Sequence, residues 1–150
     1  MTKDVLITIS GLHHEENMLT KDEETEPIEV LSPAAYYLKN GKHYILYEEP
    51  VEGTSGTIRN KIKIKEDEYL EVTKSGVTNT HMLFEKGKLS VTQYETPYGA
   101  IVVGTHTKEL KVKTAEDQID VYVQDALDVS GDKVADCEIR IKIESKLGTE

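Results

Sequence analysis

The sequence of 150 residues has no tryptophan, one phenylalanine, one cysteine and four prolines. One cysteine excludes an intramolecular disulfide and a zinc cluster built from cysteines. No apolar run approaches the roughly 20 residues that a membrane-spanning helix needs. Basic residues are scarce as well, since 18 lysines and arginines face 28 acids and give a net charge of −10. That balance argues against nucleic acid as a general partner, because such proteins need a basic surface.

The length fits a single domain, residues 1–150, because domains commonly have roughly 100–200 residues. One core of this size needs neither a metal nor a disulfide. At the N-terminus, apolar residues alternate with Thr and Ser, which is typical of a strand and not of a signal peptide. We therefore expect a cytoplasmic protein with no membrane partner, and a lone cysteine agrees with a reducing compartment. A secreted protein without its signal peptide is the alternative.

Alternation of apolar and polar residues dominates the rest of the sequence. Ile62 and Ile64 alternate with lysines, and Ile139, Ile141 and Ile143 alternate with Arg, Lys and Glu. A period of two is typical of antiparallel strands that bury one face. No stretch shows equally convincing helical spacing. The pattern predicts strands over 3–12, 27–39, 42–50, 56–66, 68–75, 78–86, 88–96, 99–113, 117–127 and 133–145.

The connections between these strands are short. Asn40-Gly41 favours the positive φ angles of a two-residue hairpin loop, and Thr-Pro-Tyr-Gly at 96–99 suits a type I turn. Consecutive strands joined in this way form a meander, which must curl to hide its apolar face and its edges. We therefore expect an all-β fold, an up-and-down meander barrel of about ten antiparallel strands.

Residues 13–26 depart from the alternating pattern and are rich in acids. Runs of like charge usually form solvated loops or tails, so we expect an acidic loop here. The alternative is a lid over one end of the barrel, with Met18 and Leu19 as its apolar contacts.

No enzyme motif stands out. The sequence has no Gly-x-Ser-x-Gly elbow, no phosphate-binding Walker loop and no His-Glu-x-x-His metal motif. Cys137 shares the parity of the following isoleucines, and its acidic neighbours Asp136 and Glu138 raise a thiol pKa, which favours an inert core thiol. We predict no catalytic residue, no metal ligand and no cofactor. A non-enzymatic function is therefore favoured over an enzyme.

One strand carries the densest basic row, formed by Arg59, Lys61, Lys63 and Lys65 on a single face. We expect a solvated sheet face whose lysines pair with acids across strands. The alternative is a patch for an anion or an acidic partner.

Several polar residues occupy positions whose parity points inward. Asn60 falls within the apolar stripe of its strand, and Gln93 and Glu95 continue the parity of Leu89 and Val91. A buried polar group needs a partner, so such positions indicate a polar network, a wet cavity or a barrel mouth. The alternative is that each group is satisfied by its neighbouring strand.

Tyrosine is compatible with a pocket, because eight tyrosines accompany the single phenylalanine and each offers apolar area with a polar tip. The alternative is that tyrosine is abundant because it is a good strand former. We predict a ligand-binding group at one opening of the barrel, with Tyr98 at its rim. Its members are Tyr47, Glu49, Asn60, Gln93, Glu95 and Tyr98.

The motifs also resemble a known family. They are Tyr36-Tyr37, Asn40-Gly41, Tyr-Ile-Leu-Tyr-Glu-Glu at 44–49, Phe-Glu-Lys-Gly at 84–87, and Tyr-Glu-Thr-Pro-Tyr-Gly at 94–99. Their order resembles the YwiB-like family of bacterial β-barrel proteins, usually placed among calycin-like, lipocalin-type barrels. The resemblance implies a cytoplasmic barrel and carries over no catalytic residue. One departure is Ser-Pro-Ala-Ala at 32–35, where the family tends to have a glycine.

Two functions fit this reading. The first is a non-enzymatic barrel that binds a small molecule in its mouth or interior, because small barrels can hold one ligand. The second is a structural or interaction barrel with a filled core and no ligand. A homo-oligomer is compatible with both.

Overall fold

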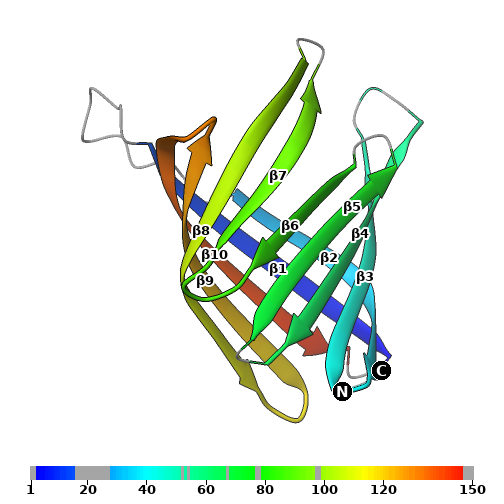
Figure 1. Cartoon of the computed structure of the whole chain (residues 1–150). Coiled ribbons are helices and arrows are strands. Elements are labelled where there is room, and N and C mark those ends of the chain that lie inside the picture. The colour runs from blue at the N-terminus through cyan, green and yellow to red at the C-terminus, as the bar shows by residue number, and fades with distance from the viewer. Residues whose placement is uncertain are drawn as a thin grey trace.

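The computed structural model describes residues 3–15, 28–51, 53, 55–66, 68–76, 79–96 and 99–146. The described residues form ten strands and no helix, so they hold no helix long and apolar enough to cross a membrane (Figure 1). The strands are β1 (Asp4–Glu15), β2 (Ile28–Lys39), β3 (Lys42–Pro50), β4 (Thr57–Lys65), β5 (Tyr69–Gly76), β6 (Thr80–Phe84), β7 (Leu89–Thr96), β8 (Gly99–Thr114), β9 (Gln118–Val129) and β10 (Asp132–Ser145).

The all-β prediction is confirmed, and each predicted strand has its counterpart. The main difference in bounds is at β1, which continues to Glu15. The first residues of the segment 13–26, predicted to be an acidic loop, therefore belong to a strand. Residues 16–27 lie outside the described residues, and so does the proposed lid.

All ten strands belong to one antiparallel sheet that curls into a nearly closed barrel (Figure 1). Its order is β6-β5-β4-β3-β2-β1-β10-β9-β8-β7. The first and last strands pair with each other over a long ladder, from Val5 opposite Ser145 to Glu15 opposite Ala135. The predicted meander barrel is confirmed, but its seam lies in the middle of the chain, between β6 and β7.

Side-chain and turn contacts hold this seam. The Thr92 hydroxyl on β7 donates a hydrogen bond of 2.9 Å to the His81 carbonyl on β6. In the β6–β7 connection, the Gly87 amide donates to the Thr107 carbonyl of β8 at 2.8 Å. The connection therefore turns toward β8, which explains why β6 and β7 do not continue as a hairpin.

The β2–β3 hairpin has the predicted turn. Asn40 and Gly41 have φ angles of 53° and 76°, which is the left-handed conformation that a type I′ loop requires at both central positions. Asparagine and glycine tolerate this region at low steric cost.

The core lies mostly toward one end of the barrel. This lower end holds the β2–β3, β4–β5 and β8–β9 connections (Figure 1). Inward-facing aliphatic side chains from nearly every strand meet there, as the period-two pattern predicts. The core cluster comprises Val5, Ile7, Tyr36, Ile45, Tyr47, Ile62, Ile64, Leu70, Phe84, Leu110, Ile119, Val121, Val123, Ile141 and Ile143.

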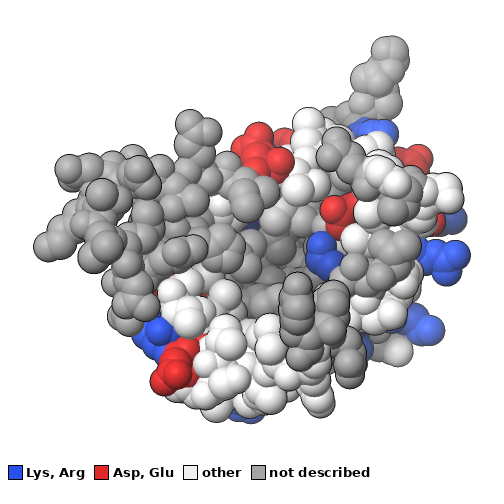
Figure 2. Space-filling model, turned by 90° about the horizontal axis from the view of Figure 1, so that it is seen from above, with Lys and Arg blue, Asp and Glu red and all other residues white. Residues whose placement is uncertain are grey.

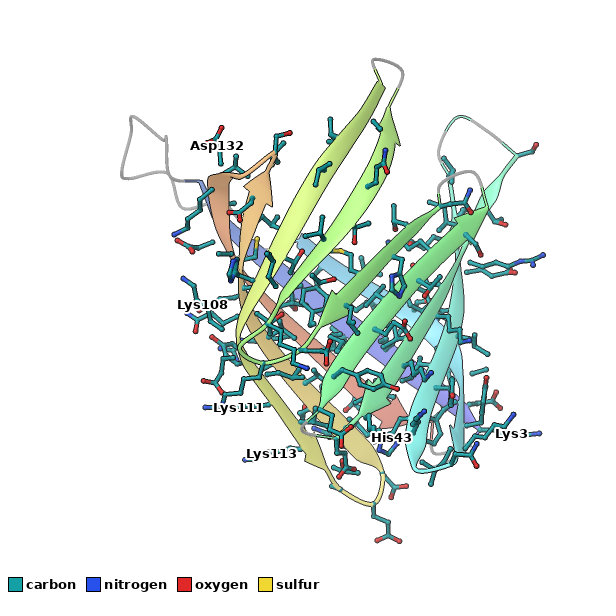
Figure 3. All side chains as sticks on the ribbon, in the orientation of Figure 1. Lys3, His43, Lys108, Lys111, Lys113 and Asp132 are labelled. Carbon is teal, nitrogen blue, oxygen red and sulfur yellow. The ribbon has the colours of Figure 1, made fainter. Side chains whose placement is uncertain are left out.

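A short polar chain joins four elements at the lower end (Figure 3). The hydroxyl of Tyr36 lies 2.7 Å from Nδ1 of the buried His43, and Nε2 of that ring lies 3.1 Å from the Glu66 carboxylate. The Thr114 hydroxyl donates to the same carboxylate oxygen at 2.6 Å. Because the carboxylate only accepts, it favours the tautomer with a proton on Nε2, which leaves Nδ1 to accept from Tyr36. The hydrogen bonds from Thr114 and His43 lower the pKa of Glu66.

Candidate functional site

Polar side chains enter the interior above this core, toward the opposite, upper end of the barrel. On one wall, Tyr47 of β3 lies opposite Asn60 of β4, which lies opposite Lys74 of β5. Glu49 follows two residues after Tyr47 and so faces the same side. Its carboxylate accepts hydrogen bonds from the Asn60 amide at 2.7 Å and from the Lys74 ammonium at 3.1 Å. The structure therefore brings Tyr47, Glu49 and Asn60 together, as the sequence predicted.

Asn60 is the most deeply buried member of this wall, with 1% of its surface exposed. Its amide nitrogen must point to Glu49, because a carboxylate can only accept. Its Oδ1 is then left without a hydrogen-bond partner in the described part of the chain. Burial, helped by the nearby Glu49 charge, raises the pKa of Tyr47 to about 12, so Tyr47 keeps its proton and can donate it to a hydrogen bond.

The other wall is formed by β8, β9 and β10. Thr107 lies opposite Asp125, and Asp125 lies opposite Cys137. All three are nearly inaccessible, with exposures of 2%, 1% and 3%. The Thr107 hydroxyl and Oδ1 of Asp125 have no hydrogen-bond partner among the described residues. An unpaired buried acceptor costs about 1–3 kcal/mol of stability. This wall therefore has hydrogen-bonding capacity that the described residues do not use.

The two titratable groups of this wall are both held toward their neutral forms. Burial raises the pKa of Asp125 to about 6, with a further increase from Asp136 and an opposing effect of Lys108. Burial also raises the pKa of Cys137 to about 12, helped by the charges of Asp125 and Asp136. The thiol is therefore protonated at neutral pH and is a poor nucleophile.

Cys137 should resist a bulky thiol reagent in the folded protein. At pH 8 we expect modification by a dinitrobenzoate disulfide reagent to be at least about 100-fold slower than in denaturant, because a buried, protonated thiol does not react. Absorbance at the released thiolate measures the rate. One thiol per chain should react in urea, and rapid labelling without urea would contradict the placement of Cys137 in the interior.

The two walls share one property, which is buried oxygen atoms without partners. Asn60, Thr107 and Asp125 each contribute one such atom, from strands on different sides of the interior. Seen from above, the described residues around the upper end include both acidic and basic side chains (Figure 2). Two of the three atoms are pure acceptors, so the arrangement suits a group that donates hydrogen bonds. The described residues contain no cluster of His, Cys, Asp or Glu that could hold a metal ion.

The inward orientation predicted for Gln93 and Glu95 on β7 is not found in the structure for the face that carries Gln93. Leu89 and Val91 are 51% and 61% exposed, and Gln93 on the same face is exposed as well. Ser90 of β7 lies directly opposite the buried Thr105 of β8. The inward face of β7 is therefore the face that carries Ser90, and Gln93 lies on the other face. The inward parity predicted for this strand is therefore wrong.

The two remaining predicted residues cannot be placed. Glu95 belongs to β7, but its side chain is outside the described part of the structure, and Tyr98 lies entirely outside the described residues. Their membership of a binding site stays a prediction.

Sequence reasoning missed Thr107 and Asp125. A signal existed for Asp125, which continues the parity of Ile119, Val121 and Val123 along β9. Thr107 had no such signal, because a register shift between Thr107 and Glu109 interrupts the parity of β8.

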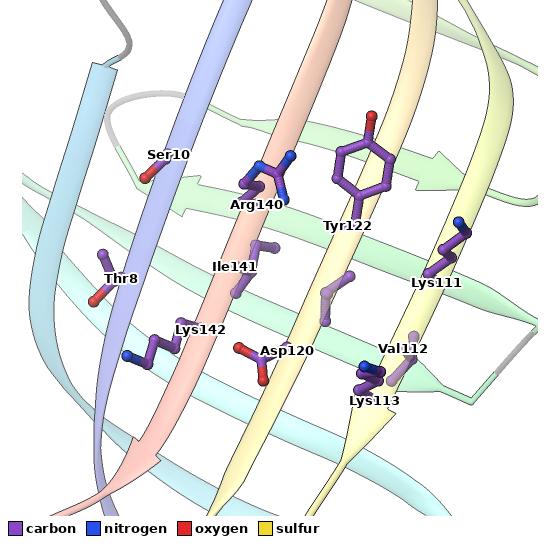
Figure 4. A pocket seen from close by; sticks show the side chains of 11 residues that line it. Thr8, Ser10, Lys111, Val112, Lys113, Asp120, Tyr122, Arg140, Ile141 and Lys142 are labelled. Atoms are coloured by element: carbon purple, nitrogen blue, oxygen red, sulfur yellow. The ribbon is translucent and has the colours of Figure 1, made fainter.

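A groove of about 670 Å³ also exists, but it lies on the outer wall of β8, β9, β10 and β1 (Figure 4). It contains none of the predicted ligand-binding residues.

This geometry defines a class of protein, the single-sheet antiparallel β-barrel with an apolar lower half and a polar upper interior. Within that class, the chain belongs to the family described as "Domain of unknown function (DUF1934)", which matches residues 13–141. This match and the similarity to YwiB itself confirm the resemblance to YwiB-like proteins.

Two relatives illustrate the likeness. The chain is 28% identical over 105 residues to the uncharacterized beta-barrel protein YwiB of Bacillus subtilis (strain 168), a match that covers 70% of this chain and 72% of that protein. The crystal structure of the ywiB protein from Bacillus subtilis aligns with a TM-score of 0.74 at 20% identity, covering 98% of this chain and 93% of the other. At that identity the structural likeness shows the fold alone.

Proposed function

We propose that the protein is a non-enzymatic barrel that binds a small molecule through its upper end. The observation that carries the proposal is the set of three buried oxygen atoms without partners on Asn60, Thr107 and Asp125. Buried polar groups in proteins are nearly always paired, so several of them in one interior suggest that another molecule completes the pairing.

The surroundings indicate what the ligand would look like. Its polar end would carry hydrogen-bond donors, such as hydroxyl or amino groups, because Asn60 Oδ1 and Asp125 Oδ1 can accept and Glu49 adds a carboxylate nearby. Its other end would be apolar, since the core below these residues is aliphatic. Barrels of the lipocalin type hold one small ligand in this manner. A cytoplasmic location is part of the proposal, supported by the single buried thiol.

Native mass spectrometry of the protein purified from its own host tests the proposal. We expect a discrete additional mass on the folded chain that disappears under denaturing conditions. The double substitution Asn60→Leu with Thr107→Val replaces both polar groups with apolar groups of similar shape and should abolish the adduct. Thr73→Val removes a hydroxyl from a half-buried β5 residue on the opposite face and should retain it.

The competing function is a filled barrel that associates through its outer face. Exposed apolar side chains on neighbouring strands favour it, since Leu31, Tyr37 and Leu46 are 63%, 39% and 37% exposed on β2 and β3. The same spectra separate the two functions. The mass of two chains with no small adduct would support self-association. The mass of one chain without an adduct would contradict both functions.

A further inference from the structure

The outer groove is built from two cross-strand rows of side chains (Figure 4). The antiparallel register places Lys111, Tyr122, Arg140 and Ser10 side by side in the first row. It places Lys113, Asp120, Lys142 and Thr8 side by side in the second row. All eight residues line the groove, and Lys111 and Lys113 point away from the barrel into solvent (Figure 3). Four cations therefore surround the centre of one groove in a protein with a net charge of −10.

The spacing of these cations follows from sheet geometry. Alternate residues on a strand lie about 7 Å apart, and β8 and β10 lie about 10 Å apart because β9 runs between them. The cations thus occupy the corners of a rectangle of about 7 by 10 Å. A single phosphate ion can contact the cations of one strand, whereas a linear di- or triphosphate can reach both strands.

Acids lie close to the groove, but only one of its four cations forms an ion pair within the described residues. Lys142 pairs with Glu144 at 3.2 Å, and Asp120 accepts a hydrogen bond from Gln118 at 2.8 Å. Glu138 accepts the Tyr122 hydroxyl at 3.1 Å. Within the described residues, no ion pair involves the remaining three cations of the groove, which are Lys111, Lys113 and Arg140.

Arg140 is positioned for anion binding by its neighbour. Its guanidinium lies over the Tyr122 ring, 4.7 Å from the ring centre. Stacking of this kind fixes the plane of the guanidinium and leaves its edge free to form two parallel hydrogen bonds to a phosphate or carboxylate. The Thr8 hydroxyl on β1 is a further donor on the same side of the groove, whereas the Ser10 hydroxyl already donates to Glu29 at 3.4 Å.

The basic row of β4 differs because it is a single row with acids on both neighbouring strands, where Glu48 of β3 lies opposite Arg59 and Glu71 of β5 lies opposite Lys63. Lys61 and Lys63 both lie over the Tyr44 ring, at 5.6 and 5.7 Å. Arg59 and Lys65 approach Glu48 and Glu68 at 3.9 and 2.8 Å. The sequence predicted a solvated face whose lysines pair with acids across strands. Among the described residues, the one cross-strand ion pair of this row belongs to Arg59, and Lys65 pairs within its own turn, so the prediction is met only in part.

We propose that the outer groove binds a small linear polyphosphate group, either as a free ion or as part of a nucleotide. The two ends of the phosphate chain would contact Lys111 and Lys113 on one side and Arg140 and Lys142 on the other. Phosphate oxygens supply the charge and the acceptors that this donor set requires. The site is separate from the barrel interior and does not depend on the proposed function.

Isothermal titration calorimetry with inorganic tripolyphosphate tests the site at low salt, where screening is weak. We expect saturable binding of one equivalent, weakened at least tenfold by Lys111→Gln with Arg140→Gln. The matched control is Lys61→Gln with Lys63→Gln, which removes the same charge from another part of the outer wall and should change the affinity less than twofold. Thermal melts verify that both variants fold, as expected for side chains that are exposed or, at Lys63, half-buried.

Further arms identify the source of the phosphate. Equal binding of tripolyphosphate and ATP supports recognition of the phosphate chain alone, and tighter binding of ATP supports a nucleotide. The proposal is overturned if tripolyphosphate at about 1 mM shows no saturable binding, or if both double variants weaken it equally, because a general field would then be responsible. A single-stranded oligonucleotide that binds the groove more tightly than either would also overturn it.

Discussion

Replacing Phe84 with alanine is expected to lower the free energy of unfolding by about 3–5 kcal/mol. Phe84 is the only phenylalanine and is 1% exposed. It ends the five-residue strand β6, where it lies opposite the fully buried Leu70. A backbone ladder joins β6 to β5, and none joins it to β7 among the described residues. Burial of this ring is therefore a main contact that holds β6 on the barrel at the seam. Its removal would leave a cavity beside the seam.

Urea denaturation followed by circular dichroism measures this loss. Leu83→Ala is the matched control, since Leu83 precedes Phe84 on the opposite face of the strand and is only half-buried. We expect it to cost less than half as much. Equal effects of the two substitutions would mean that Phe84 does not anchor the seam.

Strand positions were predictable because one face of the sheet packs into the core and the other faces solvent, which makes apolar and polar residues alternate along each strand. Ile139, Ile141 and Ile143 show the consequence directly, as each is inward and each neighbour is not. The Asn40-Gly41 loop was predictable for a different reason, because few residue pairs adopt two consecutive positive φ angles. Both signals are local in the chain.

The candidate site was only partly predictable, because parity fails at bulges. Asn60 and Glu49 lie on uninterrupted strands, and the structure brings them together. On β8, one extra residue at Lys108 exchanges the two faces. The seam adds a second uncertainty, since β7 pairs only with β8 and takes its orientation from that strand.

The outer groove could not be predicted from the sequence at all. Lys111 and Arg140 belong to different strands, and only the register of β8, β9 and β10 places them in one row. In the sequence of β8 alone, Lys111 and Lys113 do not stand out from the other lysines of the chain. The β4 row looked more basic in the sequence, yet the neighbouring strands place Glu48 opposite Arg59 and Glu71 opposite Lys63.

Asp125→Asn is expected to stabilise the protein at neutral pH by about 1–3 kcal/mol. Burial raises the pKa of Asp125 from 3.8 to about 6. Between these values the folded state binds more protons than the unfolded state, so the free energy of unfolding falls as pH rises from about 4 through about 6. Above that range the folded protein holds a buried charge, and asparagine removes it.

The expected pH profile distinguishes this cause from a simple packing effect. Urea denaturation at pH 4 and pH 7.5 should show that the gain from Asp125→Asn is present at pH 7.5 and nearly absent at pH 4, where the wild-type carboxyl is neutral as well. Asp132→Asn, at the exposed first residue of β10, should change stability by less than about 0.5 kcal/mol at both values. A gain that is the same at both pH values would contradict the assignment.

The same substitution connects stability to the proposed function. A carboxylate that destabilises the fold at neutral pH is expected where the charge serves binding. Asp125→Asn should therefore make the barrel more stable and, at the same time, weaken retention of the small molecule sought by native mass spectrometry. A variant that is more stable and keeps the adduct unchanged would remove Asp125 from the binding site and leave Asn60 and Thr107 as its remaining polar contacts.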